Sequence, residues 1–282
     1  MWLARLLYIV RAAEVNILVE MAMVARETCE VIYRDEHLVA INKPSGLLVH
    51  RSPIDRHETR YALQLVRDQM GQYVYPIHRL DKPTSGVLLF GLSSDSAREL
   101  SRQFVAGSVR KRYLAVVRGH CPPEGCIDYP LKQEFDRMAD RDPGDDLPVR
   151  NAITHYRRLA TVELPVAVER YPHTRYSLVA LRPETGRRHQ LRRHMKHIGY
   201  PLIGDAKHGK GVHNRFFKAQ YDCHRLLLAC TTLAFAHPVS GHTLVLQAAL
   251  DAPFQRVLAA FGWLGFPPTC GQARAIAQGW GD

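Results

Sequence analysis

The centre of the fold is predicted from residues 78–86, which read His-Arg-Leu-Asp-Lys-Pro-Thr-Ser-Gly. Pro83 and Gly86 favour turns, and the apolar run Val-Leu-Leu-Phe at 87–90 is short enough for a buried strand. The one carboxylate, Asp81, is therefore predicted on a loop held by a buried strand, a common way to mount a catalytic group on a rigid scaffold. Taken alone, the same residues also fit an ordinary turn with a surface ion pair.

Patterns on both sides of this loop predict further elements. Residues 31–33 and 38–41 predict an opening hairpin, and residues 94–105 predict a helix that begins at a serine cap and ends near Gly107. The polar residues 134–148 predict a flexible surface insertion. Other predicted elements are strands at 112–117, 174–181 and 243–246 and helices at 187–198 and 251–262. Because strands and helices are interspersed without a regular repeat, the pattern favours an α+β fold.

The composition predicts a globular protein that does not span a membrane. Hydrophobic residues make up 46% of the 282-residue chain, enough for a sizeable core. No stretch approaches the roughly 20 apolar residues that cross a bilayer, and the N-terminal residues fit a secretory signal poorly. The six cysteines form no Cys-x-x-Cys pair, so reduced thiols in the cytoplasm are expected.

The charge of the chain is concentrated in one segment. The formal net charge is +11, and residues 181–218 hold ten Lys or Arg residues but only two acids. Solubilising surfaces usually mix both signs. A basic segment of this kind is typical of a polyanion site, so the charge favours RNA as a partner.

Several ordered motifs resemble the RNA pseudouridine synthases whose signature is His-Arg-Leu-Asp followed by Thr-Ser-Gly. Beyond residues 78–86, the resemblance rests on residues 42–46, 111–119, 185–192, 201–205, 226–229 and 237–238. It spans roughly residues 30–250, with one departure, since the family usually has His-Ala where this chain has Ala229-Cys230. The resemblance implies a mixed central β-sheet flanked by helices, an active-site cleft across the sheet, and a reaction that needs no cofactor.

The resemblance also implies roles for individual residues. Asp81 would be the catalytic aspartate, and Arg79 would fill the place that the target base leaves in the RNA stack. Tyr113 would stack on that base, and Leu228 would line the uracil pocket. Arg187 would pair with Asp81 and orient its carboxylate. From the residues alone, Tyr113 and Leu228 equally fit a packed core, and Arg187 equally fits a phosphate contact.

The helix predicted at 187–198, with Thr185 or Gly186 as its cap, carries most of the expected RNA contacts. Three of its cations recur every four residues and predict a cationic stripe. The complete set of expected RNA-binding residues is Arg188, Arg192, Arg193, Lys196 and Lys207. Its histidines, His189, His194 and His197, match no two-histidine zinc spacing, and no nearby acid completes a ligand set, so no metal is expected.

These observations predict an RNA pseudouridine synthase with no obligatory protein partner. Its catalytic domain is expected at 29–265, between an N-terminal extension of uncertain status at 1–28 and a tail at 266–282. Phrases at 49–52, 79–89, 154–157 and 190–194 resemble the family members that modify uridine 65 of tRNA. The alternatives are a ribosomal RNA enzyme of the same family, a metal hydrolase that uses the histidines, and a non-catalytic RNA-binding protein. Intact Asp81, Tyr113 and Arg187 argue against the last of these.

Overall fold

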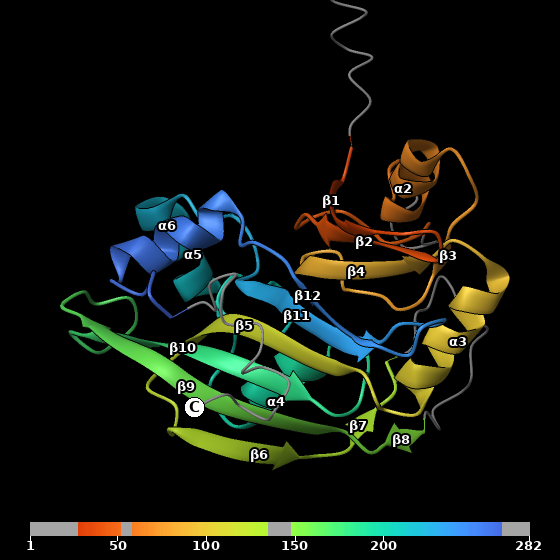
Figure 1. The fold of residues 1–282 in the computed structure, drawn as a ribbon. Coiled ribbons are helices and arrows are strands. Elements are labelled where there is room, and N and C mark those ends of the chain that lie inside the picture. The colour runs from red at the N-terminus through yellow and green to blue at the C-terminus, as the bar shows by residue number, and fades with distance from the viewer. Residues whose placement is uncertain (1–27, 52–57, 135–147, 267–282) are drawn as a thin grey trace, which may run out of the picture.

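A computed structural model describes residues 28–51, 58–134 and 148–266, and one large sheet runs through all three parts (Figure 1). Its strands are β1 (Glu30–Arg34), β2 (Leu38–Lys43), β3 (Tyr75–Pro76), β4 (Ser85–Gly91), β5 (Arg110–Arg118), β6 (Glu124–Asp128), β9 (Ile153–Leu164), β10 (Thr174–Pro183), β11 (Leu228–Ala236) and β12 (Thr243–Gln247). The order is β1-β2-β4-β11-β5-β10-β9-β6, with β12 beside β11 and β3 beside β4. Only the β4–β11 pair is parallel among the described strands, so the sheet is mixed.

Helices cover both ends of this sheet. Figure 1 shows α5 (Gly211–Tyr221) and α6 (Ala252–Ala260) together at one end, and α2 (Ala62–Met70) and α3 (Ser94–Val105) at the other. The short helix α4 (Gln190–His197) packs against the middle, and β7 (Leu131–Lys132) pairs with β8 (Val149–Arg150) in a separate small sheet. The α+β class and the mixed central sheet predicted from the sequence are confirmed.

The strand β4 lies at the centre of one half, between β2 and β11, and every one of its residues is buried. Side chains of a strand alternate between its two faces, so an entirely buried strand needs cover on both. Val87 and Leu89 pack with Leu100 of α3, whereas Leu88 and Phe90 pack with the helix α2. The buried strand predicted at 87–90 is therefore confirmed, and it fixes the loop that precedes it.

The strand β5 has the same construction in the other half. Leu114 and Val116 belong to a core cluster with Phe217 of α5 and with α6. The alternate residues, Ala115 and Val117, belong to a second cluster with α4. The apolar side chains of α4 thus hold this basic helix against the sheet. Its polar side chains are left to form the site.

Gly86 is required where the two halves meet. Its φ is +112°, and it pairs with Cys230 in the parallel contact between β4 and β11. A Cβ at this position would lie 2.1 Å from the carbonyl oxygen of Cys230, so no side chain fits. The last residue of the motif at 78–86 therefore serves backbone packing.

Most of the predicted elements are confirmed, with one clear exception. The hairpin is β1–β2, and the helix at 94–105 is α3, whose start is capped by the Ser93 hydroxyl accepting from the amide of Ser96. The helix predicted at 187–198 is wrong at its start, because α4 begins only at Gln190. His189 precedes it in the left-handed conformation, with φ of 53°, so the chain turns there instead of continuing a helix from Thr185.

Some predictions fall on residues that the structure leaves undescribed. These are nearly all of the extension at 1–28, most of the insertion at 134–148 and the tail beyond residue 266. Among the helices that are described, none combines the length and the apolar character needed to cross a membrane.

Candidate active site

The loop that carries Asp81 is fastened to the segment after β2. The buried ammonium of Lys43 donates to three carbonyl oxygens, those of Pro44 (2.9 Å), Leu47 (2.7 Å) and Lys82 (3.1 Å). Burial, followed by the charge of Arg225, lowers the pKa of Lys43 to about 7. The sequence pattern indicates no role for residues 42–46, and in the structure Lys43 holds the loop beside Asp81.

The motif residues around Asp81 divide into structural and exposed ones. His78 accepts from the amide of Leu89 (3.2 Å) and stacks on Phe104, and its burial lowers its pKa to about 4. It is therefore a neutral anchor for β4. Arg79 is exposed, whereas Leu80 is buried. The loop thus presents Arg79 outward, as a residue that enters an RNA stack requires, although that role stays a prediction.

The carboxylate of Asp81 is bound by a buried arginine, Arg192. Arg192 donates from Nη1 to Asp81 Oδ2 (3.1 Å), and its Nε and Nη2 donate to the two carboxylate oxygens of Asp205 at 2.7 and 2.8 Å. The side chain of Arg192 is 6% exposed, that of Asp205 is fully buried, and that of Asp81 is 19% exposed. Asp205 therefore fixes the guanidinium in a fork, and the guanidinium fixes the one carboxylate that solvent reaches.

The ionised state of this network follows from its pairing. Burial favours the neutral form of Asp205, but the hydrogen bonds from Arg192 and from the backbone amides of Lys207 and His208 hold its pKa below the usual value. For Arg192, burial acts against the charge, and its two carboxylate partners raise its pKa above the usual value. The pair of Asp205 and Arg192 is therefore ionised at neutral pH.

The prediction that Arg187 pairs with Asp81 is wrong. Arg187 is exposed, and its Nε donates to the carbonyl of Asn151 at 3.0 Å. Because α4 starts only at Gln190, Arg187 lies before the helix, whereas Arg192 lies on its buried side. The predicted cationic stripe is also wrong. Arg192 was expected to contact RNA phosphate, but its side chain is buried and cannot reach it.

Tyr113 and Leu228 lie together in one cluster on neighbouring strands. Leu228 is buried at the start of β11, and the partly buried ring of Tyr113 packs against its cluster. Burial, followed by the adjacent thiol of Cys230, raises the pKa of Tyr113 well above its usual value, and the charge of Asp81 adds to this. Tyr113 is therefore a neutral phenol near Asp81, not a phenolate base. Its predicted contact with a uracil ring stays a prediction.

A second group of charged side chains lies beside Asp81, and the sequence did not predict it. Glu134 has its carboxylate 3.1 Å from His189 Nδ1, 3.8 Å from His208 Nε2 and 2.7 Å from Lys207 Nζ. The other nitrogen of His189, Nε2, lies 3.9 Å from Asp81. Burial lowers the pKa of His189 to about 4 and also lowers that of His208. These residues are distant in sequence, so only the fold brings them together.

His189, His194 and His197 do not form a group in the structure. His194 is buried and contacts Thr154 and the carbonyl of Tyr129, and His197 stacks on the Tyr129 ring. Both therefore hold β6 and the loop after it against α4. Only His189 of that set faces Asp81.

The remaining RNA-binding candidates lie around this site at different exposures. Lys196 is exposed on α4, and the side chain of Lys207 is 55% exposed. Arg193 donates to the carbonyl of Lys132, and Arg188 lies 3.9 Å from Glu134. Their contact with RNA stays a prediction.

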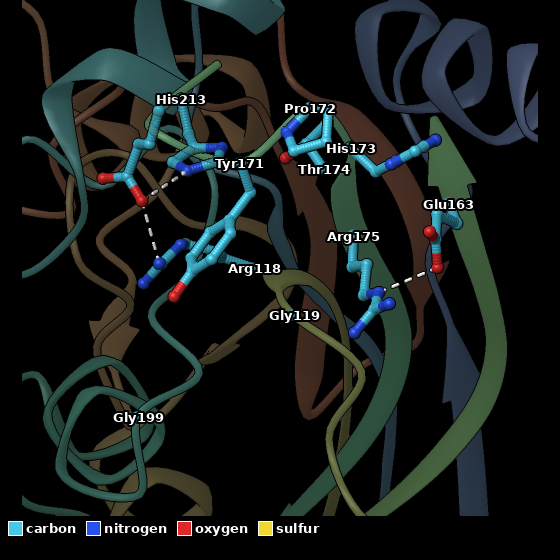
Figure 2. A pocket seen from close by; sticks show the side chains of 11 residues that line it. Arg118, Gly119, Glu163, Tyr171, Pro172, His173, Thr174, Arg175, Gly199 and His213 are labelled. Carbon is cyan, nitrogen blue, oxygen red and sulfur yellow. Dashed lines mark hydrogen bonds and ion pairs between the residues drawn. The ribbon is translucent and has the colours of Figure 1, made fainter. Parts of the chain in front are cut away.

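The structure also contains a pocket of about 390 Å³ that is separate from these residues. Figure 2 shows its polar side chains already engaged with one another. Arg118 and His213 both face Glu169, at 2.9 and 3.6 Å, and Arg175 pairs with Glu163. Neither Asp81 nor its partners line this pocket. The active-site cleft expected at Asp81 is thus a different feature and stays a prediction.

Comparisons with known proteins identify the family. The model of the family described as RNA pseudouridylate synthase matches residues 37–197. The tRNA pseudouridine synthase C of Pectobacterium carotovorum is 56% identical over 239 residues, which are 85% of this chain and 64% of that protein. The protein of the same name from Yersinia pestis is 52% identical, over 85% of this chain and 93% of its own length.

Solved structures agree at the level of the fold. Human RNA pseudouridylate synthase domain containing 4 superposes with a TM-score of 0.63 at 24% identity, over 83% of this chain and 93% of its own. Human RNA pseudouridylate synthase domain containing 1 gives a TM-score of 0.60 at 22% identity, over 84% and 96%. The chain therefore belongs to the RNA pseudouridylate synthase family, a family of RNA-modifying isomerases.

Proposed function

We propose that this protein converts a uridine of tRNA, at position 65, to pseudouridine, with Asp81 as the catalytic carboxylate. The observation that carries the proposal is the Arg192 fork, which binds Asp205 with two donors and Asp81 with a third. A bound cation favours the anionic form of a carboxylate and holds it in one direction, as a nucleophile requires.

The reaction breaks the bond between N1 of uracil and C1′ of ribose, turns the base and joins C5 to C1′. The Asp81 carboxylate can add to C6 of the base or stabilise positive charge that develops at the sugar, and both routes need its anionic form. The proton on C5 leaves after the new bond forms. Tyr113 is neutral, so it serves to hold the base by stacking and by its hydroxyl.

A flipped base needs apolar walls and a replacement in the stack. Leu228 and the Tyr113 ring supply an apolar surface beside Asp81. The exposed Arg79, two residues before Asp81, is placed to enter the gap that the base leaves, since a guanidinium plane stacks on bases. Removing a base from its stack costs a few kcal/mol, and such an insertion offsets part of that cost.

The choice of tRNA rests on two supports. The curated relatives with the highest identities given above are both named tRNA pseudouridine synthase C. The exposed cations around α4 can grip phosphates, but phosphate contacts carry no sequence information. A compact, folded RNA read by its shape therefore suits the site.

The same proposal includes catalysis by the domain at 29–265. It also includes a location in the cytoplasm, where tRNA and reduced thiols occur. Among the described cysteines, all five are free thiols.

The test uses tRNA transcripts labelled with tritium at C5 of uridine. Because C5 becomes the glycosidic carbon, each pseudouridine formed releases one tritium to water. We expect stoichiometric release from tRNA with uridine at position 65, and loss of that release when position 65 is cytidine. Release from ribosomal RNA fragments with none from tRNA would contradict the tRNA assignment and leave the family assignment intact.

A further inference from the structure

We propose that Glu134, His189 and His208 form a binding site for one divalent transition-metal ion, of the zinc class, next to Asp81. The three side chains offer one carboxylate oxygen and two imidazole nitrogens whose atoms all lie within 4.8 Å of one another. Two histidines and one carboxylate are a recurrent ligand set for zinc that leaves a fourth position open. The site goes beyond RNA isomerisation, and its test needs no RNA, so it stands or fails separately from the proposed function.

The distances between the ligand atoms fit a tetrahedral ion. Zinc ligands at about 2.0–2.1 Å from the metal lie about 3.3 Å from one another. Here His189 Nδ1 lies 3.1 Å from His208 Nε2 and 3.1 Å from Glu134 Oε2, and His208 Nε2 lies 3.8 Å from Glu134 Oε1. Small side-chain movements therefore suffice to bind an ion.

Two of the ligands are mounted on rigid backbone. His208 follows the buried Asp205, whose carboxylate accepts from the His208 amide at 2.9 Å. His189 is held in the left-handed conformation immediately before α4, and its Nδ1 lies 3.1 Å from His208 Nε2. Non-glycine residues in this conformation cost free energy and occur where the surrounding structure demands them.

The site is connected to the catalytic carboxylate through His189. A metal on Nδ1 leaves the proton on Nε2, and that nitrogen lies 3.9 Å from Asp81. A ligand histidine that presents its other N–H to a carboxylate is the usual arrangement around protein-bound metals. Metal binding would therefore fix the His189 tautomer that donates toward Asp81.

The charges around the site are mainly positive and set its affinity. Lys207 lies 2.7 Å from Glu134, Arg188 lies 3.9 Å from it, and the buried Arg192 lies behind Asp81. Lys207 is the direct competitor for the carboxylate. Its side chain is 55% exposed, so it can move into solvent when an ion arrives.

The experiment titrates tag-free, RNA-free protein with Co²⁺ and Zn²⁺. We expect one equivalent of Co²⁺ to bind with a tetrahedral visible spectrum that lacks a thiolate band, and Zn²⁺ to displace it. Glu134→Gln and His208→Ala should each weaken binding by about tenfold or more, since each removes one ligand. His197→Ala is the matched control on α4, because its ring stacks on Tyr129, and its affinity should equal that of the wild type.

Two further measurements make the result decisive. Lys207→Met removes the competing ammonium and should tighten binding by about threefold or more. In zinc-loaded protein, the ¹⁵N spectrum of His189 should show the proton on Nε2. Absence of one-equivalent binding, equal affinity in Glu134→Gln and wild type, or weaker binding in Lys207→Met would overturn the site and leave an ion-pair cluster. If His208→Ala fails to fold, the partly exposed Glu134 variant carries the test.

Discussion

Two carboxylates on one surface have nearly equal exposure but opposite surroundings. The side chain of Asp81 is 19% exposed and that of Glu134 is 18% exposed. Asp81 is bound by Arg192, which is itself locked by the buried Asp205. Glu134 is bound by an exposed lysine and two histidines that burial keeps uncharged. At nearly equal exposure, the carboxylate that is fixed in place is therefore the one whose partner is itself held by a buried ion pair.

The consequence is a division of roles. A carboxylate with a fixed partner is preorganised for chemistry, because its orientation needs no adjustment when the substrate binds. A carboxylate whose nearest charged partner is an exposed lysine can exchange that partner for a metal cation or for another charged group.

The sharpest test replaces the Asp81 carboxylate by an amide of the same shape. Asp81→Asn should reduce pseudouridine formation by at least about 10³-fold while RNA affinity changes only a few-fold, because the amide cannot act as an anionic nucleophile. Tritium release and filter binding measure the two effects. Asp95→Asn, at an exposed position on α3, is the control and should match the wild type. Turnover of Asp81→Asn near the wild-type rate would remove Asp81 from the mechanism.

The second test compares the two arginines that compete for the role of partner. Arg192→Lys keeps the charge but cannot bind Asp205 with two donors and Asp81 with a third. Turnover at saturating RNA should fall by about 10²-fold, the effect of a misplaced reacting group. Arg187→Lys should change it only a few-fold, because Arg187 contacts the Asn151 carbonyl. A larger loss of turnover in Arg187→Lys than in Arg192→Lys would instead support the predicted pairing of Arg187 with Asp81.

This pair of arginines also marks where sequence-based prediction succeeded and failed. The Asp81 loop, its buried strand and the helix at 94–105 depend on neighbouring residues, and all three were predicted. The partner of Asp81 lies 111 residues away and depends on where α4 begins. The family resemblance implied Arg187 as the partner, but the matched segment 185–192 holds three arginines after Gly186, and nothing in their local pattern told which one faces inward.

Other missed residues share this cause. Asp205 and Lys43 lie in segments that the resemblance matched, but the contacts that join them to the site reach other segments, 13 residues away at Arg192 and 39 residues away at Lys82. Glu134 lies at the edge of a polar stretch that predicted only a surface insertion. A buried charge requires an opposite charge or polar partners. The sequence marks such residues as candidates, and the fold alone decides which ones meet.

The third test removes the charge of Asp205, the carboxylate that fixes Arg192. Asp205→Asn leaves the buried Arg192 without its main anion, which should destabilise the protein by about 3–5 kcal/mol in urea unfolding. The pKa of Asp205 is lowered on folding, so its contribution is fully present above the unfolded pKa and is lost as pH falls through the folded pKa. The gap between wild type and variant should be constant from about pH 5 to 8 and shrink below about pH 4.

An exposed ion pair provides the control for that measurement. Glu184→Gln removes the partner of His155, and the Glu184 side chain is 52% exposed. Exposed pairs contribute about 1 kcal/mol or less, so this variant should unfold close to the wild type. An equally small effect of Asp205→Asn would mean that the Arg192 fork does not stabilise the fold.

The smallest expected effect lies at the surface around α4. The buried Arg192 cannot bind phosphate, so the cations to neutralise together are Arg188, Arg193 and Lys196. Each phosphate contact that is lost should reduce the slope of log affinity against log salt by up to about 0.9, and turnover at saturating RNA should stay within a few-fold. Changing Arg34, Arg98 and Arg256 instead, on β1, α3 and α6, controls for net charge. If both triple variants flatten the slope equally, the RNA responds to total charge, and the surface around α4 is not its binding face.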